Sequence, residues 1–216
     1  MAGPVATDAV PRVLILACGA LARELLDIAR LHELEGVTVD CLPASLHNTP
    51  TEIPQAVQTR LDTVRDDYDR ILLGYADCGT GGILDDLCER EGIERLPGAH
   101  CYQFFAGSHR FASIHDDDPT AFYLTDYLAK HFTRLIMGTL GIEAHPELRD
   151  MYFGNYTKVV YLAQTDDPAI EAKAREAAEL LGLAYERIDT GYGELESSVV
   201  EFTGRTPALA QEEATT

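Results

Sequence analysis

Apolar runs of strand length alternate with amphipathic stretches of helix length along most of the chain. The first run, VLILAC at residues 13–18, precedes apolar positions at helical spacing between Leu21 and Leu31. Further strand patterns begin at residues 37, 70 and 158, and a last one covers residues 184–189. Because strands and helices alternate in this way, the sequence predicts an α/β fold with a doubly wound, mainly parallel sheet.

Residues 120–156 interrupt this alternation. Residues 123–142 have the periodicity of a long amphipathic helix and a second helical pattern follows, so the segment is predicted to form a helical cover. The ends of the chain, residues 1–11 and 204–216, are rich in Pro, Ala, Thr and Glu without apolar periodicity, and we expect them to be flexible. The folded unit is therefore predicted to be a single α/β domain over residues 12–203.

Composition and charge narrow the class of protein. Hydrophobic residues make up 46% and charged residues 25% of the 216 positions, which are the proportions of an ordinary globular protein. The formal net charge of -19, without a Lys/Arg run, would repel a phosphate backbone, so we expect no nucleic-acid partner. No stretch approaches the roughly 20 apolar residues of a membrane helix and no secretion signal is visible. The chain is therefore expected to be cytoplasmic, with no membrane partner and with reduced thiols.

Three cysteines follow strand patterns at corresponding places in successive βα units. Cys18 and Cys78 are each followed by glycine, and Cys101 follows a further short strand pattern. Side chains at such positions converge at the carboxyl edge of a parallel sheet, where ligands of α/β proteins bind. Glycine lets the backbone turn and present N–H groups to a thiolate, and a helix N-terminus lowers a thiol's pKa. We therefore predict metal ligands at these three positions, the alternative being buried core thiols, which is our interpretation of Cys41 and Cys88.

Other side chains near the cysteines are candidates for chemistry. His100 is a candidate proton donor or fourth ligand, and its alternative is a loop histidine bonded to backbone. Asp77 is a candidate for orienting a ligand or binding substrate, and its alternative is a helix cap. The residues predicted to lie against a cofactor are Gly19, Gly79, Tyr75 and Tyr102, of which the two tyrosines could equally belong to the core.

Four segments carry a family resemblance: ILACGAL, LLGYADCGTGG, RLPGAHCYQFFAGS and AFYLTDYLAKHF. They resemble blocks of the bacterial and archaeal family catalogued as domain of unknown function 1638 (DUF1638). In that family, similar blocks recur as a Gly-Tyr-x-x-Cys-Gly turn, a His-x-Cys or His-Cys step and a Phe-Tyr-Leu-Thr segment. The resemblance covers most of residues 12–165 and implies a cysteine site on Cys18, Cys78 and Cys101. Many members place an acidic residue between the histidine and the cysteine, whereas His100 and Cys101 are adjacent here, so the resemblance carries no metal role onto His100.

Three protein ligands with an open fourth position are typical of a catalytic metal centre. The layout resembles the three-cysteine cluster sites of certain dehydratases and desulfidases, so a [4Fe–4S] cluster is the first choice of cofactor. Zn²⁺ on the three cysteines, with or without His100, is the second choice and would suit methyl transfer to a thiol.

These interpretations lead to alternative functions. The first is a metal-centre enzyme, an iron–sulfur or zinc-dependent lyase or transferase that acts on a small molecule in sulfur or methyl-group metabolism. The second is a non-catalytic metal- or cofactor-binding accessory protein that serves a partner enzyme. The third is a plain α/β ligand-binding protein with unbridged thiols.

Overall fold

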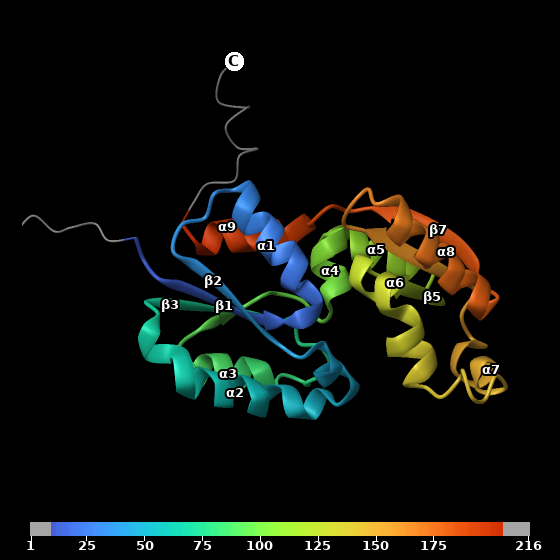
Figure 1. Ribbon diagram of the computed structural model, residues 1–216, viewed down its shortest axis with the longest axis horizontal. Coiled ribbons are helices and arrows are strands. Elements are labelled where there is room, and N and C mark those ends of the chain that lie inside the picture. The colour runs from blue at the N-terminus through green and yellow to red at the C-terminus, as the bar shows by residue number, and fades with distance from the viewer. Residues whose placement is uncertain (1–9, 205–216) are drawn as a thin grey trace, which may run out of the picture.

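The computed structural model describes residues 10–204 and forms two parallel sheets with helices between the strands (Figure 1). The strands are β1 (Val13–Cys18), β2 (Val37–Leu42), β3 (Arg70–Gly74), β4 (Glu94–Arg95), β5 (Ala121–Leu124), β6 (Lys158–Ala163) and β7 (Ala184–Asp189). The α-helices are α1 (Ala22–Leu31), α2 (Ile53–Val64), α3 (Ile83–Glu91), α4 (Cys101–Ala106), α5 (Ser108–Asp117), α6 (Asp126–Phe132), α7 (Leu148–Phe153), α8 (Pro168–Leu181) and α9 (Gly193–Phe202). The predicted α/β class is confirmed.

The first sheet has the strand order β2-β1-β3-β4, and all its pairs are parallel. Every residue of the central strand β1 is buried, because helices cover both faces of the sheet. Figure 1 shows α1 and α9 on one face and α2 and α3 on the other. Since β2 and β3 lie on opposite sides of β1, the winding direction reverses at β1, and this reversal is the switch point of a doubly wound sheet.

The second sheet has the strand order β5-β6-β7, which follows the order of the chain. One face packs against a cluster of buried residues that includes Phe132 of α6 and Ala174 of α8. The other face packs against Tyr102 of α4 and Phe111 of α5. The helices between consecutive strands of this sheet therefore share one face, so its winding direction does not reverse.

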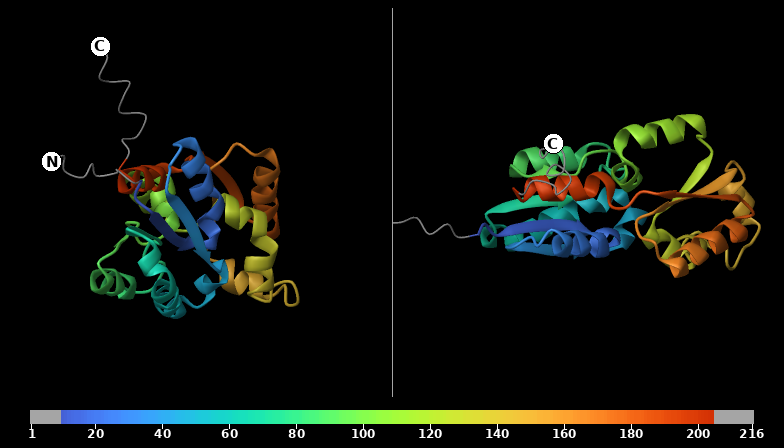
Figure 2. Two further views of the ribbon diagram at one scale, coloured as in Figure 1. Left: turned by 60° about the vertical axis from the view of Figure 1, so that its left-hand side comes forward. Right: turned by 90° about the horizontal axis from the view of Figure 1, so that it is seen from above.

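The molecule has two lobes, each built on one sheet (Figure 2). The first lobe comprises residues 10–106 and 192–204, and the second lobe comprises residues 107–191. The prediction of one domain over residues 12–203 stays a prediction. Of the ends predicted to be flexible, residues 1–9 and 205–216 lie outside the described residues.

The helical cover predicted for residues 120–156 begins differently from the expectation. Ala121–Leu124, whose second half the periodicity assigns to a helix, forms β5 instead and pairs with β6. Helix α6 follows, and a π-helix at Thr133–Gly138 and then α7 complete the segment. Four apolar residues directly before a helical pattern do not show where the strand ends, because periodicity cannot separate such short runs.

Helix α9 returns from the second lobe to the first sheet and positions α4. At Gly193, φ is +53° and a Cβ atom would lie 2.2 Å from the carbonyl oxygen of Phe105, so only glycine fits. The neighbouring Glu194 accepts hydrogen bonds from the Ser108 N–H at 2.8 Å and the Ser108 hydroxyl at 2.6 Å. These contacts clamp the α4–α5 junction, and α4 carries Cys101.

The helices give no sign of a membrane segment. None of those between residues 10 and 204 combines the length and the apolarity that a membrane crossing requires. The longest, α8, carries Glu171, Lys173 and Arg175 within its span.

Candidate functional site

The carboxyl ends of β1 and β3 lie side by side at the switch point of the first sheet. Cys18 is the last residue of β1, and Cys78 lies in the loop that follows β3. Cys101 is the first residue of α4, whose preceding loop follows β4. The topology therefore brings all three cysteines to one edge of one sheet, where α/β proteins bind ligands.

The three thiols influence one another's ionisation. Burial raises the pKa of Cys18 to about 12, and the charge of Cys78 contributes to the rise. Burial also raises the pKa of Cys101, and the charges of Cys78 and Cys18 raise it further. The pKa of Cys78 rises to about 11, chiefly through burial. The thiols are thus close neighbours that stay protonated at neutral pH, and each is a free cysteine.

A histidine contacts this cluster directly. The Nδ1 atom of His47 lies 3.5 Å from the Sγ atom of Cys18, which also accepts a hydrogen bond from the Ala20 N–H at 3.4 Å. The His47 ring stacks on Tyr75, with centroids 6.2 Å apart and an interplanar angle of 11°. Burial lowers the pKa of His47 and the nearby charge of His100 lowers it further, so His47 is neutral at pH 7.

Sequence reasoning missed His47. It lies in a 3-10 helix, Ala44–Asn48, directly after β2, in a stretch whose composition indicates only a turn. The available signal was its position just beyond the carboxyl end of a strand in the same sheet. That position places His47 at the same edge as the three cysteines.

Tyr75 brings an unsatisfied hydroxyl to the cluster. Its side chain is 1% exposed, and among the described residues its hydroxyl has no hydrogen-bond partner. Burial raises the pKa of Tyr75, and the charges of Cys18 and Cys78 raise it further, so the phenol lies beside the thiols. A buried hydroxyl without a partner is unfavourable, which makes this the part of the site that most needs a further group.

The Cys78 loop has an unusual backbone. Cys78 has a φ of +52°, in the left-handed region that residues with a Cβ rarely adopt, and Gly79 follows with +83°. The carboxylate of Asp77 accepts hydrogen bonds from the N–H groups of Gly79, Gly81 and Gly82. These bonds lower the pKa of Asp77, the bond from Gly82 most of all. Asp77 therefore holds the strained loop, and a catalytic role for it stays a prediction.

Two backbone hydrogen bonds join the Cys78 loop to the loop before Cys101. The Asp77 N–H donates to the Gly98 carbonyl at 3.0 Å, and the Cys78 N–H donates to the Ala99 carbonyl at 2.9 Å. Although the two cysteines are far apart in sequence, these bonds set their loops in register. The geometry between Cys78 and Cys101 is therefore fixed by the main chain.

The remaining predicted residues surround the cluster. His100 is the exposed residue before α4, and its charge reaches His47. The Tyr102 ring faces the second lobe, with its centroid 5.6 Å from that of Tyr123. At Gly19 a Cβ atom would lie 3.0 Å from the Leu42 carbonyl oxygen, so this glycine allows β1 and β2 to end close together. The assignment of Gly19, Gly79, Tyr75 and Tyr102 to cofactor binding stays a prediction.

The other two cysteines differ in position. Cys41 pairs with Ala17 across β1 and β2, and its charge contributes to the raised pKa of Cys18. Cys88 is buried on α3, and its pKa rises to about 11 through burial, with opposing contributions from Arg95 and Asp85. Cys88 is thus a buried thiol away from the cluster and serves as a matched control.

The donor set suits a soft metal, since it combines three sulfur atoms with a neutral imidazole. Within residues 10–204 no group of three or more His, Cys, Asp or Glu side chains is arranged to hold a metal ion. The metal site therefore stays a proposal. The fit with the donor chemistry rests on the clustered thiols and the unsatisfied Tyr75 hydroxyl.

The fold and this cluster define an α/β protein with a thiol-rich site at the switch point of a parallel sheet. The family model of the DUF1638 proteins, described as proteins of unknown function, matches residues 41–199. The chain therefore belongs to the DUF1638 family, as the sequence blocks predicted. The matched segment includes His47, Cys78 and Cys101, whereas Cys18 precedes it. Comparison with curated proteins and with solved structures found no match.

Proposed function

We propose that this chain is a metal-centre protein that holds a [4Fe–4S] cluster or, as second choice, Zn²⁺ on Cys18, Cys78 and Cys101 and uses it on a small molecule. One observation carries the proposal: three thiols lie at the carboxyl edge of the sheet around the switch point, where the charge of Cys78 raises the pKa of both Cys18 and Cys101. The C-terminal edge at such a point is the usual place for a ligand in this class of fold.

The electrostatics of the cluster favour a cation. Burial disfavours the thiolates in the metal-free chain, and the charge of Cys78 adds to this effect at Cys18, so the thiols are protonated. A cation opposes both effects, because metals bind cysteine as the thiolate and release its proton. Metal binding would therefore be coupled to proton release, and the affinity would rise with pH.

The neighbouring residues have roles that do not depend on which metal is bound. A metal or cluster with three protein ligands supplies an open coordination position with Lewis acidity. His47, which is neutral, can accept the proton that Cys18 loses, across their 3.5 Å contact. Tyr75 can donate its free hydroxyl to a thiolate or to a bound ligand.

The proposal is tested by anaerobic purification of the wild type, Cys78→Ala and Cys88→Ala, followed by analysis of metal, acid-labile sulfide and the absorption spectrum. We expect about four iron and about four sulfide per chain, or about one zinc. The content should be lost in Cys78→Ala and retained in Cys88→Ala, which removes a buried thiol elsewhere in the same lobe. A metal-free wild type, or equal metal in both variants, would contradict the proposal.

A further inference from the structure

A cavity of about 220 Å³ lies between the two lobes, beside Cys18. Its wall on the first lobe runs from Gly19 to Glu24, directly after β1, and its wall on the second lobe runs from Asp126 to His131. The charge of Glu24 reaches Cys18, since it contributes to the raised pKa of that thiol. The cavity therefore lies next to the residues that directly follow Cys18.

Glu24 brings an unsatisfied group to this cavity. The residue is 4% exposed, and its Oε2 atom is buried without a hydrogen-bond partner in the described part of the chain. Leaving such an oxygen unpaired is unfavourable, so a ligand that pairs with it gains binding energy. A hydroxyl, amino or thiol group on a ligand would provide that hydrogen bond.

The opposite wall carries cations that an acidic protein leaves unpaired. The net charge is -19, and within residues 10–204 all but five lysines and arginines form ion pairs with carboxylates. Three of the five have other partners: Arg70 lies over the Phe202 ring, Arg110 donates to a carbonyl, and Lys173 donates to the Lys130 carbonyl at 3.5 Å. The remaining two, Lys130 and Arg134, lie together with Lys173 at one place on the second lobe.

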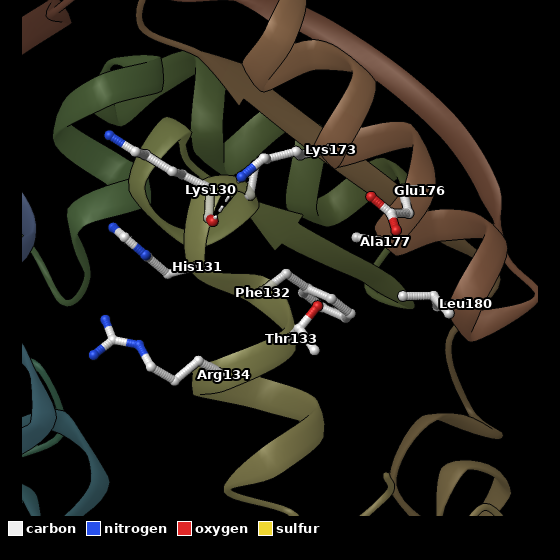
Figure 3. Close-up of a pocket in the computed structure, with 10 residues that line it drawn as sticks. Lys130, His131, Phe132, Thr133, Arg134, Lys173, Glu176, Ala177 and Leu180 are labelled. Atoms are coloured by element: carbon white, nitrogen blue, oxygen red, sulfur yellow. Dashed lines mark hydrogen bonds between the residues drawn. The ribbon is translucent and has the colours of Figure 1, made fainter.

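These three cations line a pocket of about 360 Å³ that shares Lys130 and His131 with the inter-lobe cavity. Figure 3 shows the nitrogen atoms at the ends of Lys130, His131 and Arg134 on the same side of their segment, while Phe132 points to the other side. The pKa of His131 is lowered, first by burial and then by Arg134 and Lys130, which places these cations close together. The two pockets therefore lie on either side of the same short segment, and Lys130 and His131 line both of them.

The backbone of this segment departs from a regular helix. Lys130 and Arg134 are four residues apart and His131 and Arg134 are three apart, which is the spacing that brings side chains to one face of a helix. His131 has a φ of -116° and a ψ of 15°, outside the helical range, and the π-helix Thr133–Gly138 follows it. Such distortions occur frequently at functional sites.

We infer that the inter-lobe cavity binds a small organic anion, a carboxylate or a phosphate ester, with its anionic group against Lys130 and His131, which line the cavity, and near Arg134, and with a hydrogen-bonding head group against Glu24. This inference rests on the proposed function in one respect only, namely that the bound anion is the substrate of the metal site at Cys18. The lone acid in the lining of the larger pocket, Glu176, lies on the opposite wall and leaves the cationic side free.

Binding of L-lactate and glycerol 3-phosphate tests the inference by calorimetry at constant ionic strength, with lactamide and glycerol as neutral analogues. We expect at least one anion to bind and both neutral analogues to fail. Lys130→Gln and Arg134→Gln should each weaken binding at least about tenfold, since each removes a charge-assisted hydrogen bond. Arg110→Gln, which removes an unpaired cation elsewhere, should bind as the wild type does. Binding of lactate alone would identify a carboxylate site, and binding of glycerol 3-phosphate alone a phosphate-ester site.

The role of Glu24 has its own comparison. Lactate should bind more tightly than propionate, which lacks the hydroxyl group, and Glu24→Ala should abolish that difference. Cys78→Ala, which removes the proposed metal ligand, should retain anion binding, so failure of the metal proposal is distinguishable from failure of this one. Equal binding of the anions and their neutral analogues, or wild-type binding in Lys130→Gln and Arg134→Gln, would overturn the inference.

Discussion

The two sheets end in opposite chemical environments. At the carboxyl edge of the first, the thiols of Cys18 and Cys78 are protonated and the Tyr75 hydroxyl has no partner among the described residues. At the carboxyl edge of the second, Asp126 accepts hydrogen bonds from the Tyr161 hydroxyl at 2.7 Å and the Gln164 N–H at 3.0 Å. The groups around Asp126 are therefore paired, whereas the Tyr75 hydroxyl beside the thiols is not; elsewhere in the second sheet the hydroxyls of Tyr123 and Tyr185 also lack a partner in the described part of the chain.

The difference follows from topology. The first sheet reverses its winding at β1, which is the kind of place where α/β proteins bind ligands, whereas the second sheet runs in chain order and carries the hydrogen bonds of Asp126 at its carboxyl edge. The first edge is thus equipped to receive a ligand, and the second to hold the structure together. The second lobe contributes to the site through the cations of α6 rather than through its strand ends.

The largest effect on stability is expected at Asp126, at the carboxyl edge of the second sheet. Asp126→Ala should lower the free energy of unfolding by about 3–5 kcal/mol, because it leaves buried donors of Tyr161 and Gln164 without an acceptor. Urea denaturation measures this change. Asp150→Ala, at an exposed aspartate paired with Arg149, should change the free energy by less than about 1 kcal/mol. A loss below about 1 kcal/mol for Asp126→Ala would mean that its network is not structural.

The next largest effect on stability is expected at Glu24, which lies between the two lobes. Burial raises the pKa of Glu24 to about 7, and the charge of Asp126 adds to the rise, so the folded chain holds this proton more tightly than the unfolded chain. The stability that this proton contributes is full below the ordinary pKa of about 4.5 and is lost as the pH rises through about 7. Glu24→Gln should therefore raise the free energy of unfolding by up to about 3 kcal/mol at pH 8.

The same variant should have little effect on stability near pH 4, where Glu24 is protonated in both states. Urea denaturation at the two pH values measures the difference. An equal change at both pH values would show that Glu24 acts through packing rather than through its charge.

At the carboxyl edge of the first sheet, the thiols of the metal-free chain should react slowly with an alkylating reagent. The pKa of Cys78 is about 11, so alkylation by iodoacetamide at pH 8 should be at least about 100-fold slower than for an ordinary thiol, equivalent to about 2.7 kcal/mol. Cys18, with a pKa of about 12, should react more slowly still. Mass spectrometry of the labelled peptides measures each rate. Modification of Cys78 at the rate of a small model thiol would contradict the prediction, because it would show that the Cys78 thiol ionises as readily as a free thiol.

The smallest effect is expected at the clamp between the lobes. Ser108→Ala removes the hydroxyl that donates to Glu194 but keeps the backbone N–H bond, so the loss should be about 1 kcal/mol. Ser197, an exposed serine on α9, provides the control variant Ser197→Ala. Equal thermal stability of the two variants would indicate that the hydroxyl bond does not secure α9.

Much of the first lobe could be predicted from the sequence. Strands β1 and β3 are continuous apolar runs because both faces of the sheet are covered, and each is followed by glycine-rich turn chemistry. That pattern alone places Cys18 and Cys78 at one edge. Helix α9 and strand β5 could not be assigned, because β5 is short and the return of α9 depends on contacts far away in sequence.

The rest of the candidate site depends on folding in three dimensions. Glu24 occupies an ordinary polar position on an amphipathic helix, and nothing local indicates that the second lobe covers it. Lys130 and Arg134 belong to a segment that the sequence presents as a regular helix, and only the packing of the two lobes shows that Lys130 lines a cavity. Residues from different lobes are not separated by any regular sequence spacing, so the sequence does not reveal that they line the same cavity.

The central claim is that Cys18, Cys78 and Cys101 form one site, and anaerobic titration of the metal-free chain with Co²⁺ tests it most directly. Thiolate-to-cobalt absorption should saturate at about one metal per chain. It should fall in each single alanine variant of these cysteines and remain unchanged in Cys88→Ala. Absence of the thiolate band from the wild type, or its survival in all three cysteine variants, would contradict the account.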